Sequence, residues 1–495
     1  MVGAKGHYTL SAKQTYLDNF FLSVFLSGAI VLTFLVLSLD KFGHWFVIPV
    51  FLCGVITCVD ALRWIRNQIS LLDPIGIIGL FGFWFFFVAP LLHVWFDYWM
   101  PFTAVIPPQD WREWVGMLAF FNFTGLIAFK LAMRTSVRNS NTRLSLWLID
   151  GRIFWPVLIT GLLLTAVLQI AAYYQFGGIS GYITSYEETR FGSLAFRGWG
   201  IWFVFSESFP ALLFIAYILL AQKNKILQGP FFILLALFSF LILKLVFGGL
   251  RGSRSELIFS LFWALGTVHL GLKPLSKRAV YLLLIFALIF MYLYGFYKGA
   301  GREVVSVLLG RVSPSYLEER TRRDELTVLL GDLSRTDIQS FLLYRIMKVR
   351  DYKYAWGRTY VGAISLLVPR SLWPDRPPTK VKEGTEAQYG MGSFVPDVFQ
   401  SSKVYGLAGE TMLNFTPLSI PIGFAFWGFL VARIRRFLAS LSCGDPRLLI
   451  ASWFVLAGSI VFLIGDSDNL VFFFVKNVAL LYFVVWIGTK KKRLR

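Results

Sequence analysis

The chain has 495 residues and a net charge of +20, and 56% of its residues are hydrophobic while only 15% are charged. Soluble domains carry about 25% charged residues, so the composition excludes an ordinary soluble enzyme and favours a helical bundle in a membrane. The basic residues are spread over short loops and the tail 490–493. A nucleic-acid-binding protein gathers them on one stripe, so we expect no nucleic-acid partner.

Twelve apolar stretches predict twelve transmembrane helices, each long enough to cross a hydrocarbon core about 30 Å thick. The short loops on one side carry more Arg and Lys than those on the other side, and the positive-inside rule then places both termini in the cytoplasm. The first stretch is too long for a cleavable signal peptide. The expected spans are 19–38, 44–61, 74–96, 112–133, 153–173, 199–221, 231–248, 256–272, 279–297, 411–432, 448–465 and 469–487.

These spans predict an all-α polytopic membrane protein of the inner (cytoplasmic) membrane, with one large, partly helical periplasmic loop between spans 9 and 10. Residues 1–297 would hold transmembrane helices 1–9, residues 298–405 the large loop, where we expect chemistry or recognition, and residues 406–495 helices 10–12 with a basic cytoplasmic tail. The loop contains no cysteine and no histidine. We therefore expect neither a disulfide nor a metal site in it, and no cofactor.

The first candidate residues occupy an external loop at 177–190, which contains Glu187, Glu188 and Arg190. They suit substrate binding, although for the two glutamates a solvated loop is the simpler interpretation. Farther along, Glu207 and Lys476 each lie within an apolar span, where an unpaired charge costs about 2.5–3.5 kcal/mol. They predict either a structural ion pair or a proton or ion relay of the kind a transporter needs.

A basic hairpin follows at 244–256, where Lys244, Arg251 and Arg254 surround three glycines. Arginine binds phosphate oxygens through two parallel hydrogen bonds, and glycine lets the backbone approach a ligand closely. The segment therefore suits an anionic headgroup such as a lipid diphosphate. Contact with ordinary lipid phosphates is the alternative, because long basic side chains reach the interface from helix ends.

Within the large loop, residues 313–348 have apolar positions at helical spacing, whereas 352–405 is rich in Gly, Pro and aromatic residues and predicts an irregular but ordered segment. Its aromatic side chains include Trp373 and Tyr389, and such rings suit the C–H faces of sugars. Packing of a small extracellular core or of the membrane interface is the other interpretation.

Glu410 follows two glycines at the predicted start of span 10. Partial removal of this carboxylate from water would raise its proton affinity, which suits a general base. A carboxylate near a helix N-terminus is also favourable on electrostatic grounds alone, and the sequence leaves both roles open.

Four segments together resemble the bacterial oligosaccharide repeat-unit polymerases of the O-antigen and enterobacterial common antigen type, which share a GT-C-like superfamily with the O-antigen ligases. The segments are Phe176-Gly-Gly-Ile-Ser-Gly-Tyr182, Gly248-Gly-Leu-Arg251-Gly-Ser-Arg254, Val368-Pro-Arg-Ser-Leu-Trp373-Pro-Asp-Arg376-Pro and Gly406-Leu-Ala-Gly-Glu410-Thr-Met-Leu-Asn-Phe415. The helix count and the single long loop before the last three spans resemble that family along nearly the whole chain.

This resemblance implies metal-independent glycosyl transfer at the periplasmic face, in the biosynthesis of lipopolysaccharide or exopolysaccharide. The donor would be a growing glycan on a polyprenyl diphosphate such as undecaprenyl diphosphate, and the acceptor a repeat unit on a second carrier. Expected partners are this lipid-linked oligosaccharide and membrane lipids, with a chain-length regulator and a flippase as further candidates.

We expect Arg251 and Arg254 to stabilise the departing diphosphate and Glu410 to deprotonate the acceptor hydroxyl, with Glu187 or Glu188 in reserve. A direct displacement would invert the anomeric centre. The residues expected to bind substrate are Arg190, Lys244, Arg302, Arg370, Arg376, Trp373, Tyr389 and Glu187.

Three other functions remain open. An O-antigen ligase shares the architecture, but in that family a histidine of the large loop is thought to assist catalysis, and residues 298–405 contain none. A lipid-linked glycan transporter or another carrier would explain Glu207 and Lys476, yet such proteins bind their cargo near mid-bilayer and do not need a long external loop. A non-catalytic scaffold in polysaccharide export is the third.

Overall fold

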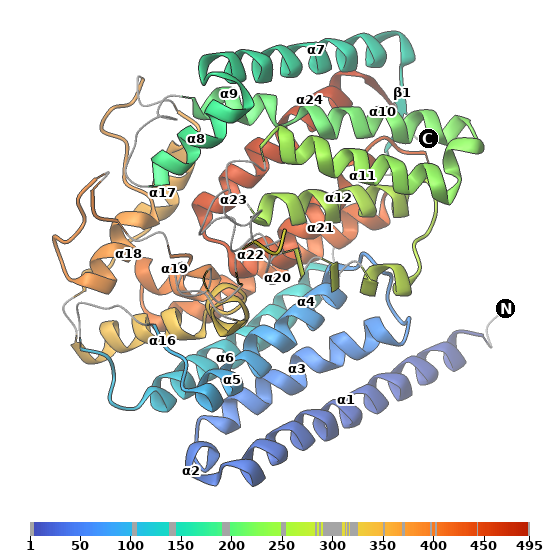
Figure 1. Ribbon diagram of the computed structural model, residues 1–495. Coiled ribbons are helices and arrows are strands. Elements are labelled where there is room, and N and C mark those ends of the chain that lie inside the picture. Colours follow the sequence, from blue (N-terminus) through green and yellow to red (C-terminus); the bar gives the residue numbers. More distant parts are fainter. Residues whose placement is uncertain are drawn as a thin grey trace. The chain divides into compact units, whose positions relative to one another are not determined.

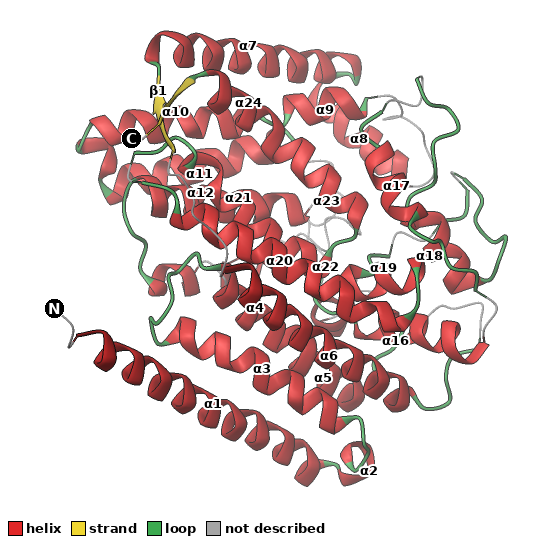
Figure 2. Cartoon of the chain, turned by 180° about the vertical axis from the view of Figure 1, so that it is seen from behind, coloured by secondary structure: helices red, strands yellow, loops and turns green. Residues whose placement is uncertain are grey.

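The computed structural model describes residues 4–100, 106–137, 145–190, 199–248, 254–282, 285–286, 289–290, 309–311, 313, 316, 325–349, 352–368, 372–396, 398–400, 403–442 and 444–493. The described chain is almost entirely helical and carries one two-stranded ribbon (Figures 1 and 2). It divides into two compact units. The first unit comprises 1–140, 329–436 and 457–471, and the second comprises 141–328, 437–456 and 472–495.

Eight described helices are long and apolar enough to cross a membrane, as expected of an all-α, multi-pass membrane protein. Together with three shorter apolar helices they overlap eleven of the twelve predicted spans, and the predicted span 279–297 lies largely outside the described residues. The eight are Gln14–Leu37, Val47–Ile65, Pro74–Phe96, Trp111–Thr135, Gly151–Gln175, Gly200–Lys223, Pro417–Ala439 and Ser467–Ile487, and the three are Pro230–Val246, Glu256–Gly271 and Leu448–Ile464.

The first unit contains the N-terminal helices and most of the described large loop. Its elements are α1 (Ala4–Leu37), α2 (Leu39–Phe42), α3 (Val47–Ile65), α4 (Pro74–Phe83), the π-helical turn η1 (Trp84–Val88), α5 (Ala89–Phe96), α6 (Trp111–Val137), α16 (Thr336–Tyr344), η5 (Arg345–Val349), α17 (Arg358–Ser365), α18 (Lys380–Tyr389), α19 (Gly406–Asn414), η6 (Pro417–Ser419), most of α20 (Ile420–Ala439), η7 (Ala457–Val461), α22 (Phe462–Ile464) and the start of α23 (Ser467–Phe474). The turn η4 (Thr327–Asp332) crosses the boundary between the units.

Small residues let the long helices of this unit approach closely. A Cβ added at Gly79 of α4 would overlap the backbone of Asp60 and Ala61 in α3, and one at Gly428 of α20 would overlap the backbone of Phe129 in α6. Close backbone approach at small residues is how helices associate in a bilayer, where burial of apolar side chains gives no extra driving force. Large apolar side chains such as Phe21 and Phe25 of α1 instead point outward, as lipid contact requires.

Contacts in the first unit agree with the predicted alternation of the spans. At one end, Arg435 of α20 forms an ion pair with Asp73 at the start of α4, at 2.9 Å. At the other end, the His93 imidazole near the end of α5 lies 3.2 Å from the Ser334 hydroxyl of the large loop. Asp73 and Arg435 lie in loops or span ends predicted on one side, whereas His93 and the large loop belong to the opposite side.

The large loop is less water-facing than its composition predicts. Residues 336–343 of α16 are all buried, and they pack against α5, α6 and α19 in the core of the first unit (Figures 1 and 2). Trp84 donates a hydrogen bond to the carbonyl of Leu333 at 2.9 Å, although it lies well inside its span. Irregular backbone at this depth is tolerated because protein surrounds it and satisfies its polar groups.

Two predictions for the large loop and the span that follows it are wrong in part. The segment 352–405 is not irregular throughout, because α17 and α18 lie within it. The sequence does not predict α18, because Pro374, Pro377 and Gly384 disfavour a helix locally. The predicted span start at 411 is also wrong. Helix α19 ends at Asn414, and the membrane-length helix begins separately at Pro417, where proline favours a new first turn. Glu410 therefore belongs to a short helix of its own and not to a span.

The second unit contains β1 (Ser145–Ile149), α7 (Gly151–Gln175), α8 (Gly178–Arg190), α9 (Gly200–Ser206), α10 (Phe209–Lys223), η2 (Ile226–Gln228), α11 (Pro230–Val246), α12 (Arg254–Gly271), α21 (Leu448–Leu456), η8 (Val475–Ala479), α24 (Leu480–Ile487) and β2 (Thr489–Arg493). The basic tail is β2, which pairs antiparallel with β1. The loop predicted at 177–190 is helical, because Gly177 and Gly178 adopt positive φ angles, end α7 and let α8 begin.

Candidate functional site

Glu410 lies at the middle of α19, with its carboxylate buried in the first unit and only 3% of the residue exposed. One oxygen, Oε1, accepts hydrogen bonds from the hydroxyls of Thr359 (2.7 Å) and Ser467 (2.5 Å). The other, Oε2, accepts one from the Ser467 backbone N–H at 2.6 Å. The carboxylate thus joins α17 of the large loop to the start of α23, and two of its three donors are alcohols.

A second carboxylate holds the start of the same helix. Asp466 Oδ1 accepts hydrogen bonds from the backbone N–H groups of Tyr405 (3.0 Å) and Gly406 (2.8 Å). The positive φ of Gly406 turns the chain into α19, and an added Cβ would lie 2.9 Å from the Leu463 carbonyl oxygen. Glycine is the residue that adopts this backbone conformation without strain.

Lys380, at the start of α18, neutralises this second carboxylate. Its ammonium group forms an ion pair with Asp466, lies 3.8 Å from Asp468 and donates a hydrogen bond to the Lys403 carbonyl at 3.2 Å. Lys380 and Asp466 are both almost fully buried. A buried charge must be paired, so the ion pair fixes α18 against the turn that carries Asp466.

Burial raises the pKa of Glu410 to about 7, and the negative charge of Asp466 acts in the same direction, while the hydrogen bonds from Ser467 and Thr359 oppose the rise. Burial also raises the pKa of Asp466, against the opposing charge of Lys380. A carboxyl group whose pKa is near neutral can both take up and release a proton at physiological pH, as general acid–base chemistry requires.

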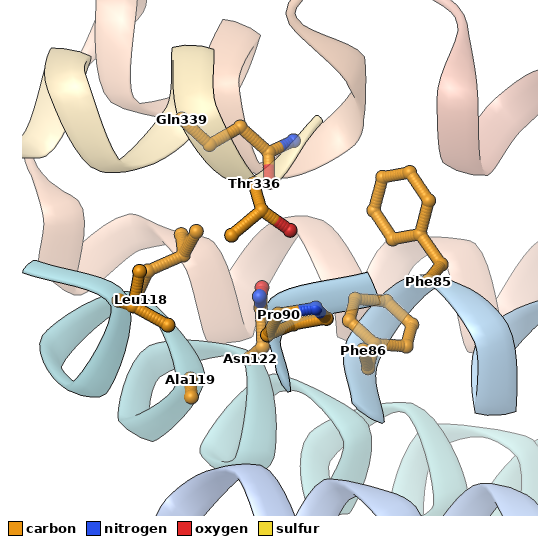
Figure 3. A pocket seen from close by; sticks show the side chains of 9 residues that line it. Phe85, Phe86, Pro90, Leu118, Ala119, Asn122, Thr336 and Gln339 are labelled. Carbon is orange, nitrogen blue, oxygen red and sulfur yellow. The ribbon is translucent and has the colours of Figure 1, made fainter. Parts of the chain in front are cut away.

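A cavity of about 10 Å³ lies below α16 in the same unit (Figure 3). Thr336 and Gln339 of α16 face Asn122 of α6 across it, and the Asn122 Oδ1 atom has no hydrogen-bond partner among the described residues. Gln339 also donates a hydrogen bond to the Tyr405 carbonyl at 2.7 Å. The space is at the lower limit for one water molecule and is far too small for a sugar ring, so it is not a glycan site.

The structure describes four of the other side chains expected at the site. Lys244 is buried and paired with Glu256 at 2.9 Å, so its charge is already neutralised within the second unit. In the first unit, Arg376 donates a hydrogen bond to the Val368 carbonyl at 3.1 Å. Trp373 is 40% exposed, and Tyr389 packs edge-to-face on Phe399.

The remaining candidates lie wholly or partly outside the described structure. Arg251, Arg302 and Arg370 are outside the described residues. Glu187, Glu188 and Arg190 belong to α8 and Arg254 begins α12, but their side chains are outside the described part of the chain.

Four residues that surround Glu410 are not among those predicted from the sequence: Asp466, Lys380, Thr359 and Ser467. One signal was available: Gly465-Asp466-Ser467-Asp468 places two carboxylates between predicted spans 11 and 12, on the side assigned to Glu410. Lys380 and Thr359 gave no comparable signal, because the helices that carry them are not evident from the sequence.

A second cluster of buried charges lies in the second unit. Lys476 forms the predicted ion pair with Glu207 and also lies 3.5 Å from Glu256, which in turn binds Lys244. Asn477 donates a further hydrogen bond to Glu256 at 3.4 Å. Two carboxylates and two ammonium groups balance one another, which fits the structural pair better than an isolated relay group. Lys476 lies in the π-helical turn η8, a distortion found often at functional sites.

We predict that Lys476→Met destabilises the protein by about 3–5 kcal/mol, because it leaves the Glu207 carboxylate buried without its cation. The double variant Lys476→Met/Glu207→Gln should recover most of this loss, since the Lys244–Glu256 pair then remains neutral. Thermal unfolding of the purified protein in one detergent compares the two. Equal unfolding temperatures for the single and double variants would show that the pair is not coupled.

Comparison with known proteins gives no relative: no protein-family model, no curated protein and no solved structure matches the chain significantly. The resemblance to the oligosaccharide polymerases therefore stays a prediction that depends on the sequence motifs.

Proposed function

We propose that the protein is a membrane glycosyltransferase that joins polyprenyl-diphosphate-linked oligosaccharide repeat units into a surface polysaccharide. The observation that carries the proposal is Glu410, a buried carboxylate with a pKa raised to about 7, held between a helix of the large loop and the turn before the last span. Such a group is suited to deprotonate a sugar hydroxyl at neutral pH.

The contacts of Glu410 indicate how an acceptor would bind. The Thr359 and Ser467 hydroxyls donate to the carboxylate at 2.7 and 2.5 Å, the geometry that an alcohol requires when it gives its proton to a base. In the proposed complex the acceptor hydroxyl replaces one of these two side chains. The proton moves to Glu410 as the hydroxyl oxygen attacks the anomeric carbon, and the bond to the lipid diphosphate breaks.

The departing diphosphate needs cations, because negative charge accumulates on it as the anomeric bond breaks. On the family resemblance we assign this role to Arg251 and Arg254. Arg254→Ala and Arg254→Lys test the assignment through the length of the extracted glycan on a gel. If Arg254→Ala makes polymer as long as that of the wild type at equal expression, the assignment is ruled out.

Incubation of the purified protein with a lipid-linked repeat unit tests the proposed function itself. A ladder of products on one lipid carrier supports a polymerase. Transfer of a single glycan to a different lipid would support a ligase instead, and unchanged substrate would contradict both enzymes.

A transporter is the second candidate, because Glu207, Lys244, Glu256 and Lys476 place four ionisable groups inside apolar helices, even though they neutralise one another. Buried ionisable groups within spans are typical of substrate and proton pathways. This candidate predicts that liposomes containing the protein move lipid-linked glycan across the bilayer without elongating it. A transporter function would leave the raised proton affinity of Glu410 unexplained.

A further inference from the structure

Trp356 stands out in the first unit because its backbone and its exposure are both unusual. Its φ angle is +49°, in the left-handed region that bulky side chains avoid, and 72% of the residue is exposed. Burial in a core explains most tryptophans, but here the ring is presented to the outside from a backbone conformation that favours Gly or Asn. Residues held in such conformations gather at ligand-binding and active sites.

Helix α19 enforces this backbone conformation. The N–H groups of Ala355 and Trp356 donate to the carbonyls of Leu413 and Asn414, at 3.0 and 2.8 Å. The next N–H, that of Gly357, donates to Asn414 Oδ1 at 3.0 Å. These bonds satisfy carbonyl groups at the end of α19 that have no partner within the helix, so the turn is fixed by the helix that carries Glu410.

The same turn is linked to the Glu410 carboxylate through side chains. Asn414 Nδ2 donates to the Thr359 hydroxyl at 2.6 Å, and that hydroxyl donates to Glu410 at 2.7 Å. One residue, Asn414, therefore positions both the turn at Trp356 and a donor to the carboxylate. These hydrogen bonds connect the backbone turn at Trp356 to the Glu410 carboxylate through Asn414 and Thr359.

Two aromatic rings lie against the indole, and a charged side chain follows two residues along the chain. Tyr354 and Phe415 lie edge-to-face with it, with ring centroids at 6.1 and 6.2 Å. The Arg358 side chain, two residues along, is 56% exposed and lies 3.0 Å from the Glu383 carboxylate. An exposed aromatic face beside hydrogen-bonding groups matches a pyranose ring, whose C–H face stacks on the indole while its hydroxyls bind the polar groups.

We propose that Trp356, with Tyr354, Phe415 and Arg358, forms a glycan-binding platform that stacks one sugar ring of the lipid-linked oligosaccharide beside Glu410. The proposal rests on the glycosyltransferase function proposed above and names the part of the substrate that this surface binds. A tryptophan that only anchors the protein in the membrane interface needs no left-handed backbone fixed to α19, so we favour a glycan over lipid as the occupant.

Fluorine NMR of protein labelled with 5-fluorotryptophan tests the platform directly. The chain has 17 tryptophans, and the Trp356 signal is the one that is lost in Trp356→Phe. The probe is the lipid-free oligosaccharide released by mild acid from the polyprenyl diphosphates of the source cells. We expect this oligosaccharide to shift the Trp356 fluorine signal of the protein in nanodiscs. A signal that the glycan leaves unmoved, but that a nitroxide-bearing lipid broadens, would overturn the platform in favour of a membrane anchor.

Substitutions separate binding from folding. Asparagine suits the left-handed backbone, so Trp356→Asn should keep or raise the unfolding temperature. The same variant should weaken glycan binding by roughly tenfold, because it removes the aromatic ring. Trp356→Phe keeps an aromatic ring and should bind glycan more tightly than Trp356→Asn. Equal binding by the wild type and Trp356→Asn would overturn the platform. If the wild type and Trp356→Asn bind glycan equally but the purified protein still makes a ladder of elongated products, the platform is wrong and the polymerase proposal stands. If glycan binding depends on Trp356 but no ladder of products forms, the platform is supported and the polymerase proposal is contradicted.

Discussion

Glu410→Gln is expected to lower the rate of glycan elongation by about 100- to 10,000-fold, the range by which general bases accelerate proton transfer. The amide keeps an oxygen that can accept from Thr359 and Ser467, but it cannot take up the acceptor proton. Its NH2 group would also face the backbone N–H of Ser467, so a stability loss of about 1–3 kcal/mol is expected as well. The rate must therefore be measured per folded protein, with initial rates of elongation on purified material.

Glu386→Gln is the matched control. Glu386 is another buried carboxylate of the large loop, and its Oε1 accepts a hydrogen bond from a backbone N–H, that of Gly392, at 3.3 Å. Removing its charge should leave elongation close to the wild-type rate. If both variants lose activity equally, the loss reflects disturbance of the loop and the assignment of the base fails.

The raised pKa of Glu410 gives opposite pH dependences for activity and stability. The base works when it is deprotonated, so elongation should rise with pH around a midpoint near 7. The folded state binds the Glu410 proton more tightly than the unfolded chain, where the pKa is near 4.5, so this group's contribution to stability decreases as pH rises from about 4.5 to about 7. Measurements of rate and unfolding temperature across this window check both. A rate that is independent of pH would contradict the role of Glu410.

Asp466→Ala is expected to produce the largest loss of stability in the first unit, about 3–5 kcal/mol. It leaves the Lys380 ammonium buried without its carboxylate and removes the acceptor of two N–H groups at the start of α19. Asp468→Ala is the control, because Asp468 lies 3.8 Å from Lys380 and its side chain is partly exposed. The double variant Lys380→Met/Asp466→Asn should recover most of the loss, since asparagine still accepts from the backbone.

Thermal unfolding in detergent compares these variants, and a stability loss equal for Asp466→Ala and Asp468→Ala would contradict the assigned ion pair. Asp466→Ala has a second expected effect. Because the negative charge of Asp466 helps to raise the pKa of Glu410, its removal should shift the midpoint of the activity profile to lower pH. If Asp466 had only a structural role, Asp466→Ala would lower stability without moving the midpoint of the activity profile.

The sequence predicts the membrane-length helices well because hydrophobicity over about twenty residues is a strong, local signal. It also singles out the Glu207–Lys476 pair, since an ionisable group within an apolar span requires a partner. Glu410 is singled out by its place after two glycines at the start of a predicted span. The sequence does not reveal the break between α19 and the following helix, because an apolar window cannot distinguish one helix from two that meet at Pro417.

The surroundings of Glu410 were less accessible to prediction. Helix α18 carries a central glycine and follows several prolines, both of which argue locally against a helix. Its tertiary context accounts for that glycine: a Cβ added at Gly384 would overlap the ring of Tyr405. Lys380 and Asp466 are 86 residues apart in the sequence, and only the folded chain brings them together. Pairings of this kind follow from packing and have no local sequence signal.

An experimental density map of the protein in nanodiscs, with a bound lipid-linked repeat unit, would show directly whether Glu410 is the base. We expect a sugar hydroxyl within hydrogen-bond distance of the Glu410 carboxylate, in place of the hydroxyl of Thr359 or Ser467. A glycan bound elsewhere, with both of these side chains still donating to Glu410, would contradict this assignment.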